Sequence, residues 1–297
     1  MAPPVDIIIL AYNKYRYTEF CLRSVLLTSY RPLHVICIDN GSEDRTEAVL
    51  AGFEEQGQAD NIQVTLITNM TNTGAIQGRN QALEHCSGEY VLFLDNDVVA
   101  ADRNWVDMLT GFFSLHPNAG AVSPKLIYPV EPYLIQCAGC DVSPTGKVNF
   151  RGRGEDRNEP RFNRTCTVQS LISACMAVPA SVIRQTGKFD TLFSPVQYED
   201  IDYCYRIKEL GLDLFYYADL EMYHFENVTT SRSRKLNSAY NTVKNGMKFK
   251  RKWEHVFSRE NGPEQASMEW KDIKTVDISD IDSKIFPNGS ENPKSGR

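Results

Sequence analysis

The fold of this chain is indicated by residues 90–97, which read YVLFLDND. Five apolar or aromatic residues stand in a row and two carboxylates follow at once, which predicts a strand that is covered on both faces and ends in a polar loop. Three similar runs come earlier in the chain, at residues 5–10, 34–39 and 62–67.

The segments between these strands carry apolar residues at helical spacing. They cover residues 15–27, 43–55 and 74–85, and a fourth helical segment follows at 105–115. Short strands that alternate with longer helices are typical of βαβ units and of a parallel sheet. We therefore predict an α/β fold in which a mostly parallel central sheet is flanked by helices.

The regular alternation ends near residue 121. Residues 121–178 are rich in proline, glycine and arginine, which indicates loops and short strands. A helix is predicted to begin near Pro179, because proline suits the first helical turn, and a second one over residues 198–210. Residues 214–217 are predicted to form a strand.

The composition limits the classes of function. The 297 residues carry a net charge of −6, which excludes a nucleic-acid binder with a globally basic surface. No apolar run approaches the roughly 20 residues of a transmembrane helix, and the N-terminus lacks the features of a signal peptide. The eight cysteines lie mostly in apolar segments, and Cys137 and Cys140 lack the second pair that a zinc site needs. We therefore expect a cytoplasmic protein.

One segment departs from this acidic composition. Residues 232–252 contain eight lysines and arginines and no acid. Apolar side chains recur there at helical spacing, which predicts a basic amphipathic helix. They either pack onto the rest of the protein or contact an anionic membrane surface or a lipid-diphosphate acceptor. The side chains concerned are Leu236, Tyr240, Val243 and Met247.

The carboxylates of Asp95 and Asp97 are the strongest functional signal. In open α/β sheets, the carboxyl ends of the strands border the crevice that binds ligands. An Asp-x-Asp turn at this edge suits a divalent cation that holds diphosphate oxygens. The alternative is a structural turn or a helix cap, since Asp and Asn favour both.

A further acid ends the strand predicted at residues 34–39. Asp39 is placed to accept hydrogen bonds from a nucleobase, and Gly41 permits a close approach of the ligand. The alternative is a strand-to-helix turn in which Ser42 caps the next helix, and the two roles are compatible.

Two other loops at this edge bear on phosphate binding. Residues 11–13, Ala11-Tyr12-Asn13, end the first strand without a glycine, so the GxGxxG fingerprint of dinucleotide enzymes is absent. Residues 72–75 open a helix that carries Arg79, and a helix N-terminus beside a guanidinium is a natural diphosphate site.

Three acids open a later helix, at Glu199, Asp200 and Asp202. The helix dipole stabilises acids in a first turn, which is the structural explanation. The functional explanation is a general base that removes a proton from an acceptor hydroxyl. His224 follows a predicted strand, and a histidine without context is more often structural than a ligand.

Taken in order, these elements resemble the family-2 glycosyltransferases, the inverting enzymes of the GT-A fold. The resemblance runs from about residue 5 to residue 224. It rests on residues 11–13, 39–42, 72–80, 95–97, 187–190 and 199–211.

The resemblance implies a role for each motif residue. Asp39 resembles the acid that contacts the nucleotide base, and Arg79 resembles a residue of the donor site. Asp95 is similar to the acid near the ribose and the metal shell. Asp97 is similar to the direct Mg²⁺ or Mn²⁺ ligand, and His224 to a further metal or diphosphate contact.

The same resemblance implies that Asp200 is the catalytic base and that Glu199 orients or contacts the acceptor. The remaining residues implied for nucleotide-sugar binding are Ala11, Asn13, Gly74 and Asn96. A metal held by Asp97 neutralises the departing nucleoside diphosphate, and one displacement with Asp200 as base inverts the anomeric carbon.

The implied function is glycosyl transfer from a nucleotide sugar, with a UDP-sugar as the expected donor. The acceptor stays open between a carbohydrate, a lipid-linked and a protein hydroxyl, and the expected role is bacterial-type cell-surface polysaccharide or glycoconjugate synthesis. One alternative is a nucleotidyltransferase, although residues 11–16 lack the glycines of that chemistry. The other is a non-catalytic nucleotide-sugar-binding protein, although both key acids are present.

This assignment also divides the chain. Residues 1–227 are expected to form the GT-A catalytic domain, with a donor half over 1–118 and an acceptor half over 119–227. Residues 228–257 form the basic helical extension, and 258–297 a polar, flexible tail. The extension allows a peripheral position at the inner face of a membrane, while the oligomeric state is left open.

Overall fold

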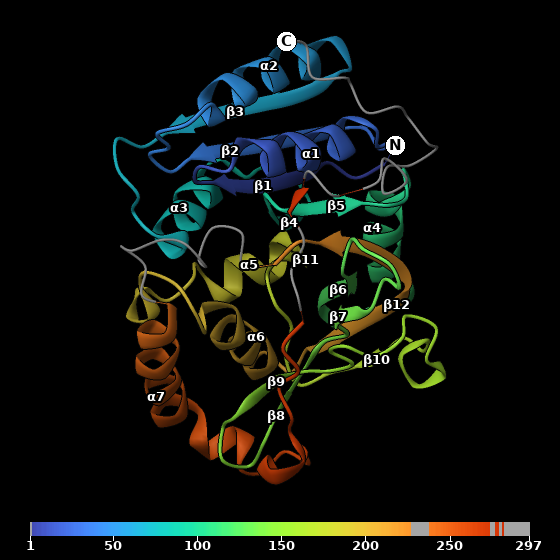
Figure 1. Ribbon diagram of the computed structural model, residues 1–297, viewed down its shortest axis with the longest axis vertical. Coiled ribbons are helices and arrows are strands. Elements are labelled where there is room, and N and C mark those ends of the chain that lie inside the picture. The colour runs from blue at the N-terminus through green and yellow to red at the C-terminus, as the bar shows by residue number, and fades with distance from the viewer. Residues whose placement is uncertain (1, 227–237, 274–276, 279–280, 282–297) are drawn as a thin grey trace.

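The computed structural model describes residues 2–226, 238–273, 277–278 and 281. In Figure 1 the N-terminal strands and helices, in blue, lie at the top, and helix α7 (Ser238–Phe257) lies at the lower left. No helix among the described residues is long and apolar enough to cross a membrane.

The first half alternates strands and helices as the sequence predicts. Every residue of its second strand is buried, and so are all but one of the first, because helices cover both faces of the sheet here. The elements are β1 (Val5–Ala11), α1 (Tyr15–Leu26), β2 (Leu33–Asp39), α2 (Thr46–Ala59), β3 (Ile62–Thr68), α3 (Ala75–Ala82), β4 (Tyr90–Asp95), β5 (Val98–Ala100) and α4 (Trp105–Leu115).

The second half has shorter strands and loops. The strand predicted at residues 214–217 is longer than expected, and the helix near Pro179 is short. The elements are β6 (Ala119–Ile127), β7 (Ile135–Cys137), β8 (Cys140–Val142), β9 (Val148–Phe150), β10 (Cys166–Thr167), β11 (Cys175–Pro179), α5 (Ala180–Thr186), α6 (Glu199–Glu209) and β12 (Asp213–His224).

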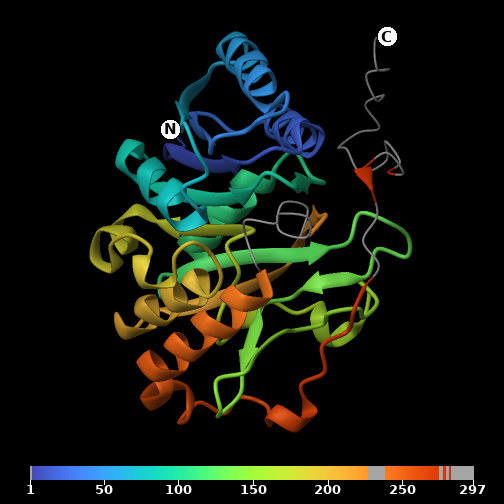
Figure 2. The same ribbon diagram turned by 60° about the vertical axis from the view of Figure 1, so that its left-hand side comes forward.

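A mixed sheet runs through both halves, in the order β10-β12-β6-β11-β4-β1-β2-β3, with β5 beside β12 and β7 beside β6. Strands β3, β2, β1 and β4 are parallel, and β12 is parallel to β6. Strand β11 runs antiparallel between β4 and β6 and so joins the halves. The α/β class is confirmed, and Figure 2 shows helices on both sides of the sheet.

The register of the sheet gathers the predicted motifs at one edge. Ala11 is paired with Asp39 on β2, and Leu10 is paired with Asp95 on β4. Because these strands are parallel, their carboxyl ends lie side by side. From the second half, His224 at the end of β12 pairs with Val98, which directly follows the Asp-x-Asp turn.

Helix α2 starts later than the sequence suggests. Its first residue is Thr46, and the residue before it makes no side-chain cap. The hydroxyl of Ser42 accepts a hydrogen bond from the amide of Asn13 at 2.8 Å, so it ties two loops together and does not cap α2.

Helix α7 packs with a different face from the one that the sequence predicts. Phe249, Trp253 and Phe257 are buried, and the indole nitrogen of Trp253 donates to the carboxylate of Asp202 on α6 at 2.8 Å. This second apolar row, at four-residue spacing, fills the contact with α6. The prediction that the other apolar row packs onto the protein is wrong for its three described side chains. They are between 61% and 66% exposed: Tyr240, Val243 and Met247. Leu236 lies outside the described residues.

Residues 258–273 differ from the flexible tail that the sequence predicts. Glu260 pairs with Lys208 on α6. The guanidinium of Arg153 donates to the carbonyl of Lys271 at 2.9 Å and lies 4.0 Å from the ring centroid of Trp270. The prediction is therefore wrong for this segment, because its few aromatic and acidic side chains find partners on the second half.

Candidate active site

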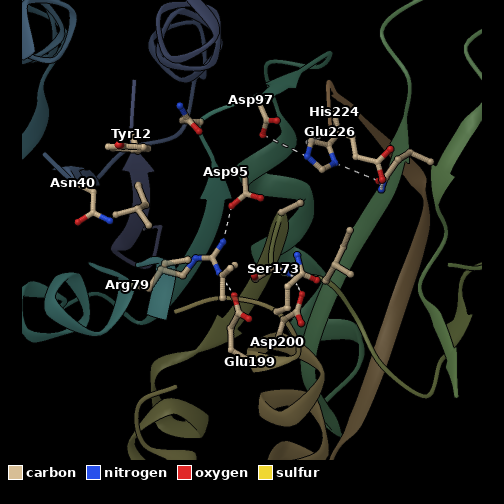
Figure 3. Close-up of a pocket in the computed structure, with 18 of the residues that line it drawn as sticks. Tyr12, Asn40, Arg79, Asp95, Asp97, Ser173, Glu199, Asp200, His224 and Glu226 are labelled. Carbon is tan, nitrogen blue, oxygen red and sulfur yellow. Dashed lines mark hydrogen bonds and ion pairs between the residues drawn. The ribbon is translucent and has the colours of Figure 1, made fainter. Parts of the chain in front are cut away.

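A cavity of about 250 Å³ lies at the carboxyl ends of β1 and β4. Residues from both halves of the chain line it, and Figure 3 shows their side chains pointing toward a common space. The lining includes five carboxylates, which makes this space strongly acidic: Asp95, Asp97, Glu199, Asp200 and Glu226.

Three of the predicted residues are arranged as a candidate metal site. Ligand atoms of Asp95, Asp97 and His224 all lie within 4.8 Å of one another. The Nε2 atom of His224 is 3.4 Å from a carboxylate oxygen of Asp97. Two carboxylates and an imidazole suit a divalent cation of the Mn²⁺ or Mg²⁺ kind, so the residues fit the predicted metal.

The charge of His224 is set by its surroundings. Burial disfavours the imidazolium, but the carboxylates of Asp97 and Asp95 outweigh burial and raise the pKa of His224 to about 9. Its Nδ1 lies 3.3 Å from the side-chain oxygen of Gln136, which can only accept, so Nδ1 carries a proton. Gln136 therefore turns Nε2 of the ring toward Asp97.

Glu226 supports the same arrangement through Gln136. Its carboxylate accepts two hydrogen bonds from Arg153, at 2.7 and 3.0 Å, one from the hydroxyl of Tyr128 at 2.7 Å, and one from Gln136 at 3.3 Å. Against the effect of burial, Arg153 lowers the pKa of Glu226 and keeps it ionised. The sequence did not point to Gln136 or Glu226, although Glu226 follows His224 by two residues.

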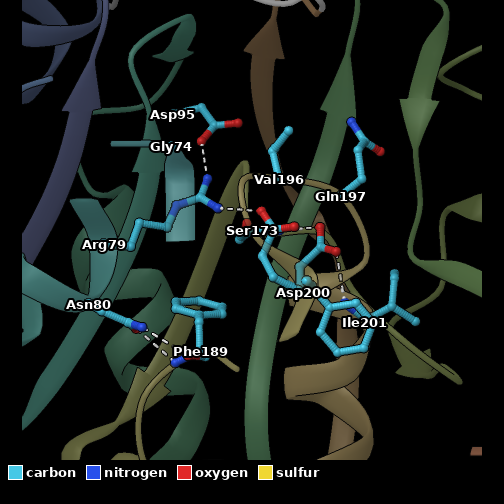
Figure 4. Close-up of polar contacts among 12 residues, drawn as sticks. Gly74, Arg79, Asn80, Asp95, Ser173, Phe189, Val196, Gln197, Asp200 and Ile201 are labelled. Atoms are coloured by element: carbon cyan, nitrogen blue, oxygen red, sulfur yellow. Dashed lines mark hydrogen bonds and ion pairs between the residues drawn. The ribbon is translucent and has the colours of Figure 1, made fainter. Parts of the chain in front are cut away.

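Arg79 links the acids of the two halves. Its guanidinium donates to Asp95 at 2.6 Å (Figures 3 and 4) and to Glu199 at 3.2 Å (Figure 3). The ring of Phe189 lies 5.9 Å from the guanidinium. The side chain of Asn80 holds the backbone of Phe189, accepting from its amide at 2.8 Å and donating to its carbonyl at 2.9 Å. The basic side chain predicted for the donor site is thus held in place on both sides.

Glu199 and Asp200 open helix α6 at the floor of the cavity. One oxygen of Glu199 is buried without a hydrogen-bond partner among the described residues, and burial together with Asp200 raises the pKa of Glu199 to about 7. Asp200 accepts from the amides of Ile201 at 2.8 Å and Ser173 at 3.4 Å. Burial raises the pKa of Asp200 despite these bonds, which makes it a better proton acceptor.

Asn40 organises the loop between β3 and α3. Its side-chain oxygen accepts from Asn69 and twice from Thr73, and its amide donates to Asn72 and to the carbonyl of Gly74. Gly41 beside it has φ +78°, and a Cβ there would lie 2.6 Å from the backbone of the same loop. Asn40, Asn72 and Tyr12 line the cavity, although within the same motifs only their neighbours were predicted to bind the nucleotide sugar.

The other residues predicted for nucleotide-sugar binding divide into two groups. Asn96 lines the cavity and donates to the hydroxyl of Thr18 at 2.8 Å. The others lie in the adjoining strand ends and loops and are not part of the cavity lining: Ala11, Asn13, Asp39 and Gly74. The carboxylate of Asp39 accepts from the amide of Ser42 at 2.8 Å, so it shapes the loop that carries Asn40.

Cys137 and Cys140 are buried thiols. Burial raises the pKa of Cys140 well above its usual range, and the thiol of Cys137 donates to the carbonyl of Gly139 at 3.3 Å. Among the described residues, no metal-ligating group includes either cysteine.

Residues 6–170, more than half of the chain, match the model of glycosyl transferase family 2. The chain is 29% identical over 195 residues to the pre-mycofactocin glycosyltransferase of Mycobacterium tuberculosis, which covers 64% of this chain and 37% of that protein. It is 26% identical over 199 residues to the glucosyl-dolichyl phosphate glucuronosyltransferase of Haloferax volcanii, covering 63% and 56%. The matched region is thus less than two thirds of either relative.

Solved structures match this fold over a larger share of the chain than the sequence relatives do, although their sequences are less similar. A mannosyltransferase from Pyrobaculum calidifontis in complex with GDP-Man and Mn²⁺ has a TM-score of 0.61 at 18% identity, over 89% of this chain and 66% of that one. GalNAc-T7 with UDP, GalNAc and Mn²⁺ has a TM-score of 0.61 at 16% identity, over 79% and 47%. These likenesses show the GT-A fold, and the match over residues 6–170 shows that the chain belongs to glycosyl transferase family 2.

Proposed function

We propose that this chain is an enzyme that transfers a sugar from a nucleotide sugar to a hydroxyl acceptor in one inverting displacement. The observation that carries the proposal is the placement of Asp200. This carboxylate comes from the second half of the chain, yet it lies in the same cavity as Asp95, Asp97 and His224. A base and a candidate metal site therefore face one space in which a donor and an acceptor meet.

Each side chain has a defined part in this reaction. Asp97, Asp95 and His224 are the residues that would hold a divalent cation, and such a cation would neutralise charge on the departing nucleoside diphosphate. Arg79 keeps the acids on the two sides of the cavity at a fixed separation. Asp200 takes the proton of the acceptor hydroxyl, with its carboxylate oriented by two backbone amides.

The donor is proposed to be a UDP-sugar, bound through the loops that carry Ala11, Asn13, Asp39 and Gly74. The UDP in the GalNAc-T7 structure supports this nucleotide, whereas the Pyrobaculum enzyme was solved with GDP-Man. The acceptor is a carbohydrate, a lipid-linked or a protein hydroxyl. The Haloferax relative is named for glucosyl-dolichyl phosphate, a lipid-linked sugar, which supports the lipid-linked hydroxyl among these acceptors. A role in cell-surface polysaccharide or glycoconjugate synthesis is part of the same proposal.

The test is release of nucleoside diphosphate from a panel of nucleotide sugars in the presence of Mn²⁺. Asp200→Asn should lower the rate of transfer by about 10²- to 10⁴-fold, because the general base is lost. Donor binding, measured by thermal shift, should stay unchanged. Asp219→Asn, at an exposed acid of β12, is the matched control.

Three results would contradict the proposal. Full transfer activity in Asp200→Asn excludes this residue as the base. Pyrophosphate release from a nucleoside triphosphate indicates a nucleotidyltransferase, and donor binding without turnover of any donor and acceptor indicates a non-catalytic binding protein.

A further inference from the structure

Helix α7 is fixed to the protein by one face. Asn245, Phe249 and Trp253 are buried on this face, which we call the inner face. The ammonium of Lys252 lies 2.7 Å from the carboxylates of both Asp190 and Asp202, which adds two ion pairs on the same side. The orientation of the helix about its axis is therefore set by contacts with α6 and with the loop before it.

The opposite side of α7 is apolar and exposed. Val243 and Met247 stand one turn apart and are 66% and 61% exposed, and Tyr240 continues the same row. Residues four apart lie on the same side of a helix, so these side chains form one strip. A strip of exposed apolar side chains on a well-packed helix marks an interaction surface.

Cations flank this strip. Lys244, Lys250 and Arg251 are exposed, and none of them forms an ion pair with a described residue. Glu254 is the one acid in the helix. It is exposed and, four residues after Lys250, lies on the same side as the strip, so three cations outnumber one carboxylate there. We define the outer face of α7 as Val243, Met247, Lys244, Lys250, Arg251 and Glu254.

We propose that the outer face of α7 docks on an anionic lipid surface. An apolar strip bordered by cations matches the layers of such a surface, where acyl chains lie below negatively charged headgroups. The net charge of −6 repels the rest of the chain from this surface, so the attraction is local to α7 and orients the protein. This docking is independent of the glycosyl transfer proposed above.

Docking through α7 places a membrane close to the active site. Asn245 on the inner face donates to the carbonyls of Val196 and Gln197, two residues that line the cavity. The helix that meets the lipid is thus in direct contact with the wall of the cavity. A lipid-linked acceptor would be within reach of a protein held in this way.

The test is co-sedimentation of the purified full chain with phosphatidylcholine vesicles, with and without phosphatidylglycerol and with no donor present. We expect binding to the vesicles that contain phosphatidylglycerol and weak binding to the others. Lys244→Gln and Arg251→Gln should each weaken binding roughly fivefold at low salt. Val243→Glu with Met247→Glu should abolish it.

Matched controls use exposed positions far from α7 in the chain. Leu115→Glu, at a side chain that is 79% exposed on α4, and Arg103→Gln should bind vesicles like the unchanged protein. Circular dichroism and melting curves verify that all variants fold. Binding that does not depend on phosphatidylglycerol, or that survives the Val243→Glu, Met247→Glu change, overturns the proposal. So does self-association through this face without vesicle binding, measured by sedimentation velocity. Nucleoside diphosphate release, assayed separately, does not enter this outcome.

Discussion

Asn245 connects helix α7 to the active site. Its side-chain amide donates to the carbonyls of Phe193, Val196 and Gln197, at 2.6, 2.9 and 3.1 Å, and it is fully buried. Asp200, the candidate base, follows this loop by three residues. We therefore predict that Asn245 positions the base although it lies outside the cavity lining.

The loop that Asn245 holds is under backbone strain. Gln197 and Tyr198 have φ values of 84° and 71°, in the left-handed region, which costs about 1–3 kcal/mol per residue outside glycine. Helix α7 packs closely against Tyr198, since a Cβ at Gly246 would lie 3.0 Å from its hydroxyl. Contacts from α7 thus hold a conformation that the loop would otherwise leave.

The perturbation is Asn245→Leu, which removes two N–H donors and keeps the number of side-chain heavy atoms. At about 1 kcal/mol net per hydrogen bond, the free energy of unfolding should fall by roughly 2 kcal/mol. Release of the loop should displace Asp200, and a shift of about 1 Å lowers catalysis by about 10²-fold. The assays are urea unfolding and kcat at saturating donor with Mn²⁺.

Asn241→Leu is the matched control, since this buried residue lies one turn earlier on the same face of α7 and makes no side-chain hydrogen bond to any described residue. It should leave kcat unchanged. A loss of stability in Asn245→Leu with an unchanged kcat would refute the positioning role, because the helix would then stabilise the protein without acting on the base. An unchanged stability would refute the hydrogen bonds themselves.

Two further predictions concern the acids of the cavity. Saturating Mn²⁺ should raise the melting temperature by about 5 °C, as expected for about 3 kcal/mol of ligand-linked stability. This gain should vanish in Asp97→Ala and persist in Asp219→Ala, and an equal gain in both variants would contradict the metal site. The second prediction concerns Glu199, whose pKa is raised to about 7 in the folded protein, so its stabilising contribution is present below about pH 4.5 and is lost as the pH rises through 7. The unchanged protein should therefore lose stability relative to Glu199→Gln as the pH rises. The melting temperature of the variant minus that of the unchanged protein should increase by a few degrees between pH 5.5 and 8.5, and a constant difference would argue against the raised pKa.

The sequence allowed the first half of the fold and most of the motif positions to be predicted. Strands β1, β2 and β4 are continuous apolar runs, and their parallel pairing follows from the helices between them, so Asp39 and Asp95 had to reach one sheet edge. Gln136 could not be found in this way. Its contact with His224 depends on the pairing of β7 with β6 and of β6 with β12, which joins residues 88 positions apart.

The largest difference concerns the face of α7 that is buried. The apolar spacing of Tyr240, Val243 and Met247 is a sound helical pattern, and the helix forms. Phe249 and Trp253 form a second row with the same spacing, so periodicity alone offers two faces for burial. The choice between them is made by α6, where Asp202 is fully buried and receives the indole N–H and the ammonium of Lys252.

Local chemistry thus determines which strands and helices form and which acids end them, because backbone preference and apolar periodicity act over a few residues. The order of the strands, the meeting of Asp200 with Asp97 and the outward direction of Val243 are decided by tertiary packing. These depend on contacts between segments that are far apart in the chain, where burial of apolar surface and pairing of buried charges outweigh any local pattern.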